Sequence, residues 1–192
     1  MSVSSWPLLL IFAIIGPGVL LSYGLVLKGA SSQEIDDLFA GISGAARIPF
    51  AILPPCCAVA FCYSTYYLLF DIAATDTVVL GVAWESGGEA LVCALYFLVI
   101  APSCAWMPLT VKCLRAPAGG VGAVVAVLNV VGVAAIGLMV CALTQTGSAA
   151  VGSRYTLHCW ATILFAGQTQ VREREHLLRC RSRARAYVLA DP

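Results

Sequence analysis

Residues 118–144 read AGGVGAVVAVLNVVGVAAIGLMVCALT and contain no Asp, Glu, Lys, Arg or His. A helix of about 20 apolar residues crosses the hydrocarbon core of a bilayer, so this run is long enough to span a membrane. Three further stretches lack the same residue types, namely residues 7–27, 48–70 and 90–111. The sequence therefore predicts an all-α fold, a polytopic bundle of transmembrane helices.

The overall composition agrees with a membrane domain. Of the 192 residues, 60% are hydrophobic and 11% are charged, whereas a soluble domain has about 25% charged residues. The first run lacks a basic n-region and a small-residue cleavage site, and it is too long for the apolar part of a signal peptide. We therefore expect a retained span at 7–27 and one membrane domain over residues 1–171.

Residues 155–171 form a shorter and more polar run, and the basic residues of the connecting segments decide how to interpret it. If this run spans the membrane, every segment rich in Lys or Arg lies on one side, which the positive-inside rule assigns to the cytoplasm. The sequence then predicts five spans, with the N-terminus outside and the C-terminus cytoplasmic. The basic residues, in chain order, are Lys28, Arg47, Lys112, Arg115, Arg154, Arg172, Arg174, Arg179, Arg181, Arg183 and Arg185.

Two segments are expected to lie at the cytoplasmic surface. Ser31 and Glu34 have the spacing of a capping box, which predicts the start of an amphipathic helix over about 32–44, lying on the membrane. Residues 172–192 form a basic tail whose arginines suit anionic lipid headgroups. The expected partners are thus membrane lipids and other membrane subunits or a second copy of the chain, and no nucleic acid.

Prolines interrupt three of the predicted spans near the middle of the membrane. Pro17 lies in the first span, Pro54 and Pro55 in the second, and Pro102 in the third. Each proline leaves the carbonyl four residues earlier without its helical donor. Such groups can bind a solute at the midplane of a transporter, or they can be satisfied by neighbouring helices as ordinary kinks.

Polar side chains within the spans are few. Asn129 lies near the centre of the fourth span and Ser103 at a similar depth in the third, so we expect a hydrogen bond between them. The glycines around Asn129 give the fourth span a small-residue surface on which another helix can pack. Tyr63, Tyr66 and Tyr67 end the second span, where their amphipathic rings are expected to anchor the membrane interface or, as the alternative, to form an aromatic cage for a quinone, sterol or pigment.

His158 is the one histidine in a predicted span. It can hydrogen-bond to a neighbouring helix or ligate a haem or a pigment, and the sequence does not decide between them. No cluster has the spacing of a metal site, and no C-x-x-C motif occurs, so we expect no metal and no cofactor. A disulfide between Cys141 and Cys159 is a further hypothesis, because both are expected near the outer surface.

The scarcity of titratable groups in the spans argues against general acid–base catalysis. We therefore expect a non-catalytic structural or accessory subunit of a membrane complex, in the plasma membrane or an endomembrane. The alternative is a small transporter or channel for a neutral or lipidic solute. Its candidate pathway is the proline-broken midplane, and the polar residues to examine for packing or transport are Asn129, Ser103, Pro17, Pro54, Pro55, Pro102 and His158.

Overall fold

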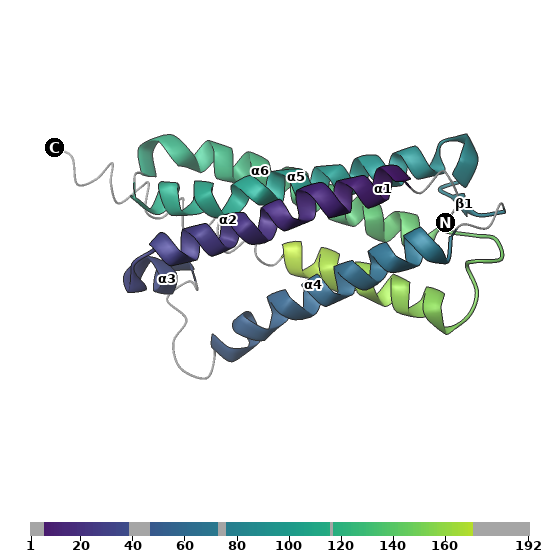
Figure 1. Ribbon diagram of the computed structural model, residues 1–192, viewed down its shortest axis with the longest axis horizontal. Coiled ribbons are helices and arrows are strands. Elements are labelled where there is room, and N and C mark those ends of the chain that lie inside the picture. Colours follow the sequence, from purple (N-terminus) through teal and green to yellow (C-terminus); the bar gives the residue numbers. More distant parts are fainter. Residues whose placement is uncertain (1–5, 39–46, 73–75, 116, 171–192) are drawn as a thin grey trace.

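The computed structural model describes residues 6–38, 47–72, 76–115 and 117–170. The described chain is mostly helical, and its long helices lie side by side along one axis (Figure 1). Three helices are long and apolar enough to cross a membrane: Trp6–Gly29, Gly88–Arg115 and Gly120–Leu143. They confirm a mostly helical fold, and they coincide with the first, third and fourth runs that were expected to span the membrane.

The first membrane helix is continuous but not regular. It consists of α1 (Trp6–Leu10), a π-helical turn η2 (Ile11–Ile15) and α2 (Gly16–Gly29). The π turn directly precedes Pro17, whose missing N–H falls inside the continuous helix, so the change of helix type lies where the proline removes a helical hydrogen bond. The break expected at this proline is therefore a local change of helix type rather than an interruption.

A short helix follows at the far end of α2. Helix α3 (Ser32–Leu38) begins with the predicted capping box: the Glu34 N–H donates to Ser31 Oγ at 3.2 Å, and the Ser31 N–H donates to Glu34 Oε2 at 2.7 Å. The start of the expected 32–44 helix is thus confirmed, and its remainder lies outside the described residues.

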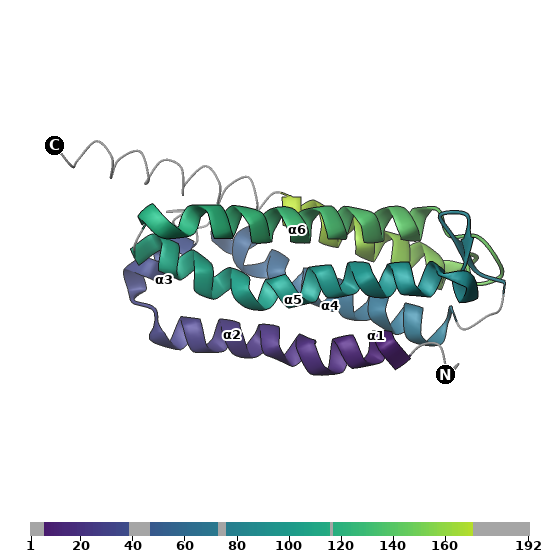
Figure 2. The same cartoon turned by 90° about the horizontal axis from the view of Figure 1, so that it is seen from above.

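Helix α4 (Arg47–Phe70) coincides with the second predicted span, and the helix continues through Pro54 and Pro55. The long helix α5 (Gly88–Arg115) contains Pro102 and Pro108, and α6 (Pro117–Leu143) lies beside it along its length (Figure 2). A final helix covers residues 153–170, where the fifth span was predicted. The basic tail 172–192 lies outside the described residues.

The segment between α4 and α5 contains structure that the sequence did not predict. Strands β1 (Val78–Val79) and β2 (Val82–Ala83) form an antiparallel hairpin, followed by a 3-10 turn, η4 (Trp84–Ser86). Leu80 and Gly81 both have positive φ, 53° and 78°, as the two-residue turn of a tight hairpin requires. The 145–149 segment lies against this hairpin, because Val78 pairs with Thr146.

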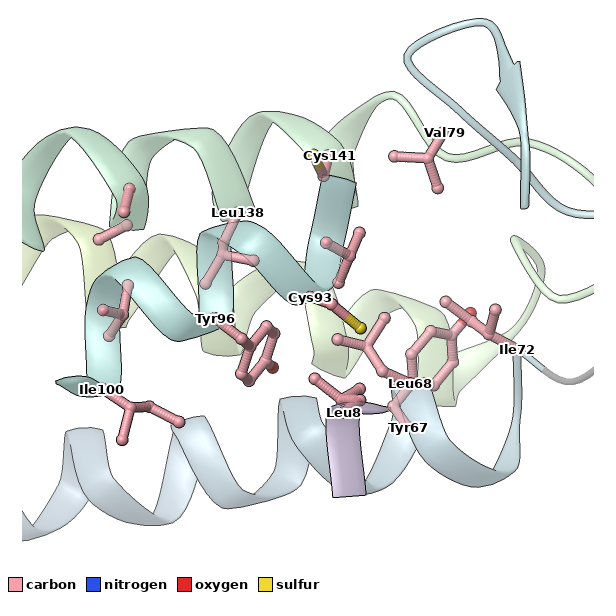
Figure 3. Packing of buried hydrophobic residues seen from close by; sticks show 14 of the residues in the cluster. Leu8, Tyr67, Leu68, Ile72, Val79, Cys93, Tyr96, Ile100, Leu138 and Cys141 are labelled. Atoms are coloured by element: carbon pink, nitrogen blue, oxygen red, sulfur yellow. The ribbon is translucent and has the colours of Figure 1, made fainter. Parts of the chain in front are cut away.

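Successive long helices alternate in direction, so the connections gather at two ends of the bundle (Figures 1 and 2). The β1 end holds the start of α1, the hairpin and residues 144–152. The α3 end holds α3 and the turn between α5 and α6. The main core fills the β1 half between α4, α5 and α6, with Leu8, Tyr67, Tyr96 and Leu138 pointing inward (Figure 3). A smaller core around Trp106 lies in the α3 half.

Candidate functional site

Seven polar side chains lie inside the β1 half of the bundle, none of them more than 9% exposed. They come from three separate parts of the chain: α4, α5 and the segment 145–162. Buried polar groups need hydrogen-bond partners, so their positions together are a specific feature of the fold. We call this set the polar cluster; its members are Ser64, Thr65, Tyr67, Tyr96, Gln145, His158 and Thr162.

A chain of hydrogen bonds crosses the polar cluster between three helices. Ser64 Oγ lies 3.1 Å from the Tyr96 hydroxyl and 3.1 Å from His158 Nδ1. A consistent assignment has Tyr96 donate to Ser64 and Ser64 donate to Nδ1, which places the imidazole proton on Nε2. Hydrogen bonding of His158 to a neighbouring helix, one of the two interpretations of this residue, is thus confirmed.

Tyr67 is the second centre of the polar cluster. Its ring stacks on the His158 ring, with centroids 4.4 Å apart and planes 17° from parallel. Its hydroxyl donates to the Ala149 carbonyl at 2.5 Å and accepts from Gln145 Nε2 at 3.1 Å. Tyr67 is only 1% exposed, so the expectation that it anchors the membrane interface is wrong; its neighbour Tyr66 is half exposed. The buried Tyr67 hydroxyl instead attaches residues 145–149 to α4 through these two hydrogen bonds.

A small cavity adjoins Ser64, Tyr96, Gln145, His158 and Thr162, with apolar residues completing its wall. Its volume, about 10 Å³ for the centre of a water molecule, is enough for about one water. A buried water needs two to four polar partners, and the lining offers that number. The polar cluster can thus hold a bridging water, and its geometry fits a structural network rather than a solute site.

Two loops cover the polar cluster at the β1 end. Asp76 accepts from the Ser148 N–H at 2.8 Å and from the Ser148 hydroxyl at 2.7 Å, and these bonds lower the pKa of the Asp76 carboxyl. Between them Gly147 has φ +111°, and a Cβ there would lie 2.5 Å from the Asp76 carbonyl oxygen. Only glycine fits this close approach. The loops therefore form one closed cap over the bundle end.

An ion pair holds the α3 end. Arg115 Nε lies 2.5 Å from Glu34 Oε1, and Arg115 Nη2 donates to Glu34 Oε2 at 3.2 Å and to the Gly29 carbonyl at 3.3 Å. One side chain at the end of α5 thus fastens α3 and also pairs a carbonyl at the end of α2. The Arg115 guanidinium lowers the pKa of Glu34 to about 2, helped by the Ser31 N–H.

The proline-broken midplane is closed by neighbouring helices where its contacts are described. The Cys104 thiol, two residues beyond Pro102, donates to the Ile15 carbonyl at 3.7 Å, beside the break that precedes Pro17. A Cβ on Gly18 would lie 3.4 Å from the Cys104 sulfur, so α2 and α5 are in close contact here. These contacts show that α2 and α5 pack closely beside the break that precedes Pro17.

Ser103 and Asn129 are not brought together. The Ser103 hydroxyl donates to the Val99 carbonyl of its own helix at 2.6 Å, and Asn129 is exposed on α6. The expected hydrogen bond between them is therefore not formed. Ser103 satisfies its hydroxyl by bonding one turn back along α5, which is common for serine within a helix. Asn129 instead points away from the bundle.

The small residues of α6 divide between two faces. Gly137 faces α5, because a Cβ there would lie 2.8 Å from Leu95 Cδ2, and Gly120 similarly faces Cys113. A continuous stripe of exposed residues also runs along α6, and we call it the α6 seam. Its members are Gly122, Ala126, Asn129, Val133, Ile136, Val140 and Leu143.

The expected disulfide would join Cys141 of α6 to Cys159 of the 153–170 helix. Cys141 and Cys159 are both free thiols in the structure, so the proposed disulfide is not formed there. The Cys159 thiol instead donates to the Ala142 carbonyl at 3.7 Å. Within the described ranges, no group of three or more His, Cys, Asp or Glu residues could hold a metal ion.

Comparison with known proteins gives no relative of this chain. The sequence matches no known protein family and no curated protein, and the fold matches no solved structure. The helices long and apolar enough to cross a bilayer identify it as a helical membrane protein.

Proposed function

We propose that this protein is a five-span, non-catalytic accessory subunit of a membrane complex, with its N-terminus outside and its C-terminus cytoplasmic. The alternating helix directions support this topology, because they collect Lys28, Lys112 and Arg115 at the α3 end. Among the described residues, the β1 end carries Asp71, Asp76 and two glutamates, with Arg154 as its one basic residue. The positive-inside rule assigns the α3 end to the cytoplasm.

The exposed position of Asn129 on the α6 seam is the observation that carries the subunit role. Asn129 lies near the middle of α6, and a span in that position puts its amide in the hydrocarbon core. An unpaired amide is unfavourable in hydrocarbon, and a hydrogen bond between membrane helices contributes about 0.6–2 kcal/mol. A partner helix on the α6 seam removes this cost by pairing with the amide, and Gly122 and Ala126 let its backbone approach closely.

Other exposed helix faces have a different character. The outward residues of the first membrane helix are large aliphatic side chains, such as Leu20 at 74% exposure and Leu21 at 64%. Such side chains suit lipid tails directly and need no partner. The α6 seam differs from this face because it contains a polar side chain and small residues, and this difference supports the α6 seam as the main assembly surface. In the same proposal the arginines of the tail, residues 172–192, bind anionic lipid headgroups on the cytoplasmic side.

The test is purification in mild detergent followed by native mass determination of the wild type and two variants. Asn129→Leu removes the amide from the α6 seam, whereas the control Val130→Leu changes a neighbouring exposed residue outside it. We expect an assembly larger than one chain for the wild type and Val130→Leu, and a shift towards single chains for Asn129→Leu. An unchanged assembly in both variants would refute the role of the α6 seam.

The same purified proteins are used to test the alternative function, a transporter or channel. Reconstituted vesicles are assayed for flux of small neutral solutes with the wild type and with Pro102→Ala, which alters the midplane of α5. If the wild type is a single chain and Pro102→Ala changes flux, the transporter or channel is the correct function and the accessory-subunit proposal is wrong.

A further inference from the structure

The seven residues of the α6 seam have the spacing of a helix-pairing surface. From Gly122 to Leu143 they follow one another at intervals of four and three residues, and every one of them is exposed. Two helices that cross at a small left-handed angle meet along positions with this spacing. The α6 seam extends over 22 of the 27 residues of α6. One partner helix can therefore contact it from end to end.

The sizes of the side chains along the α6 seam fit such a contact. Gly122 and Ala126 lie in the α3 half, where they allow two backbones to come close. Val133, Ile136 and Val140 lie in the β1 half and are β-branched, with few rotamers to lose when they are packed. Asn129 lies between the two groups as the polar position.

We propose that the occupant of the α6 seam is a second copy of this chain, related to the first by a two-fold axis parallel to the membrane normal. This inference rests on the proposed function and names its partner. All copies insert into the membrane in the same orientation, so two α6 helices can meet in parallel and in register. Residues of equal number then face each other, which brings Asn129 against Asn129 at equal depth.

The chemistry of Asn129 favours a copy of itself. The side-chain amide has both a donor and an acceptor, so two asparagines across a two-fold axis satisfy each other. A different partner would need its own polar group at the same depth. Helix α6 also contains no charged residue, so the two-fold arrangement places no like charges opposite each other. Polar pairing fixes the register, while the small and β-branched residues provide the contact area.

The test is self-crosslinking in native membranes, with Cys56, Cys62 and the tail residue Cys180 first replaced by serine. Val140→Cys places a thiol on the α6 seam, and Val130→Cys places one outside it at similar exposure, 36% and 40% for the two valines. We expect an oxidant to link two Val140→Cys chains into a covalent dimer and to leave Val130→Cys chains monomeric. Equal crosslinking of the two variants, or none at position 140, would overturn the inference.

A second measurement separates this inference from the proposed function. Two copies with different tags are co-expressed, and their dimerisation is measured by energy transfer in vesicles at several lipid dilutions. We expect Asn129→Leu to weaken dimerisation roughly three- to fifteenfold, because hydrogen bonds between membrane helices have modest energies. If the two tags never associate but a different protein crosslinks at position 140, the subunit role stands and the second-copy inference fails. If nothing associates with the α6 seam, both fail.

Discussion

Replacing Tyr67 by phenylalanine measures how strongly the outer loops are fastened to the bundle. The substitution removes one oxygen atom and keeps the ring, so the stack on His158 at 4.4 Å is preserved. It eliminates the hydrogen bond to the Ala149 carbonyl and the one from Gln145 Nε2. Each such bond contributes about 1 kcal/mol net, and an unpaired donor on the buried Gln145 adds about 1–2 kcal/mol. We expect Tyr67→Phe to lower the free energy of unfolding by about 3–4 kcal/mol.

The neighbouring Tyr66 provides a matched control. It lies one residue earlier on α4 and is 50% exposed, so Tyr66→Phe makes the same chemical change outside the core. We expect that variant to change the free energy of unfolding by less than about 0.5 kcal/mol. Both are measured by titrating the protein with sodium dodecyl sulfate in mixed micelles and following tryptophan fluorescence. Equal destabilisation by the two substitutions would show that the Tyr67 hydroxyl does not fasten the loops.

Two further predictions concern the ends of the bundle. Gly147→Ala should lower the free energy of unfolding more than Gly152→Ala in the same titration. Both glycines have positive φ, but only a Cβ at position 147 collides with Asp76. Equal losses of unfolding free energy would contradict the closed cap. Arg115 lowers the pKa of the Glu34 carboxyl from its ordinary value of 4.5 to about 2. The ion pair therefore contributes fully to stability above about pH 4.5, and this contribution is lost as the pH falls towards 2. Carbon-13 NMR of labelled glutamate should measure this low pKa in the wild type and a pKa of Glu34 closer to 4.5 in Arg115→Gln. An unchanged pKa of Glu34 in that variant would refute the pairing.

Local signals in the sequence predicted the elements that depend on short stretches of chain. Ser31 and Glu34 are three residues apart, so their capping box could be recognised directly, and the structure has both of its hydrogen bonds. The charge-free runs located the long helices to within a few residues. By contrast, Asp76 and Ser148 are 72 residues apart in the chain, and no local pattern in either loop indicates that they bond.

The prediction of the site failed where the orientation of helix faces was needed. Helix α6 is apolar on all sides, so hydrophobic periodicity could not tell which face meets α5 and which stays exposed. Matching depths suggested a pair between Ser103 and Asn129, but depth leaves the rotation of each helix undetermined. The structure turns Asn129 outward and brings Tyr67 and His158 inward, where the sequence had given the tyrosine to the membrane interface.

The sequence by itself determined that this is a helical membrane protein, because long apolar runs without charges can only satisfy their backbone groups in a bilayer as helices. Only the tertiary structure decided which side chains meet. The polar cluster joins α4, α5 and the 153–170 helix, and the α6 seam is the stripe left exposed where residues such as Val131 and Leu138 turn inward. Both depend on how each helix is rotated in the bundle, and that rotation is set by the packing of all the helices together.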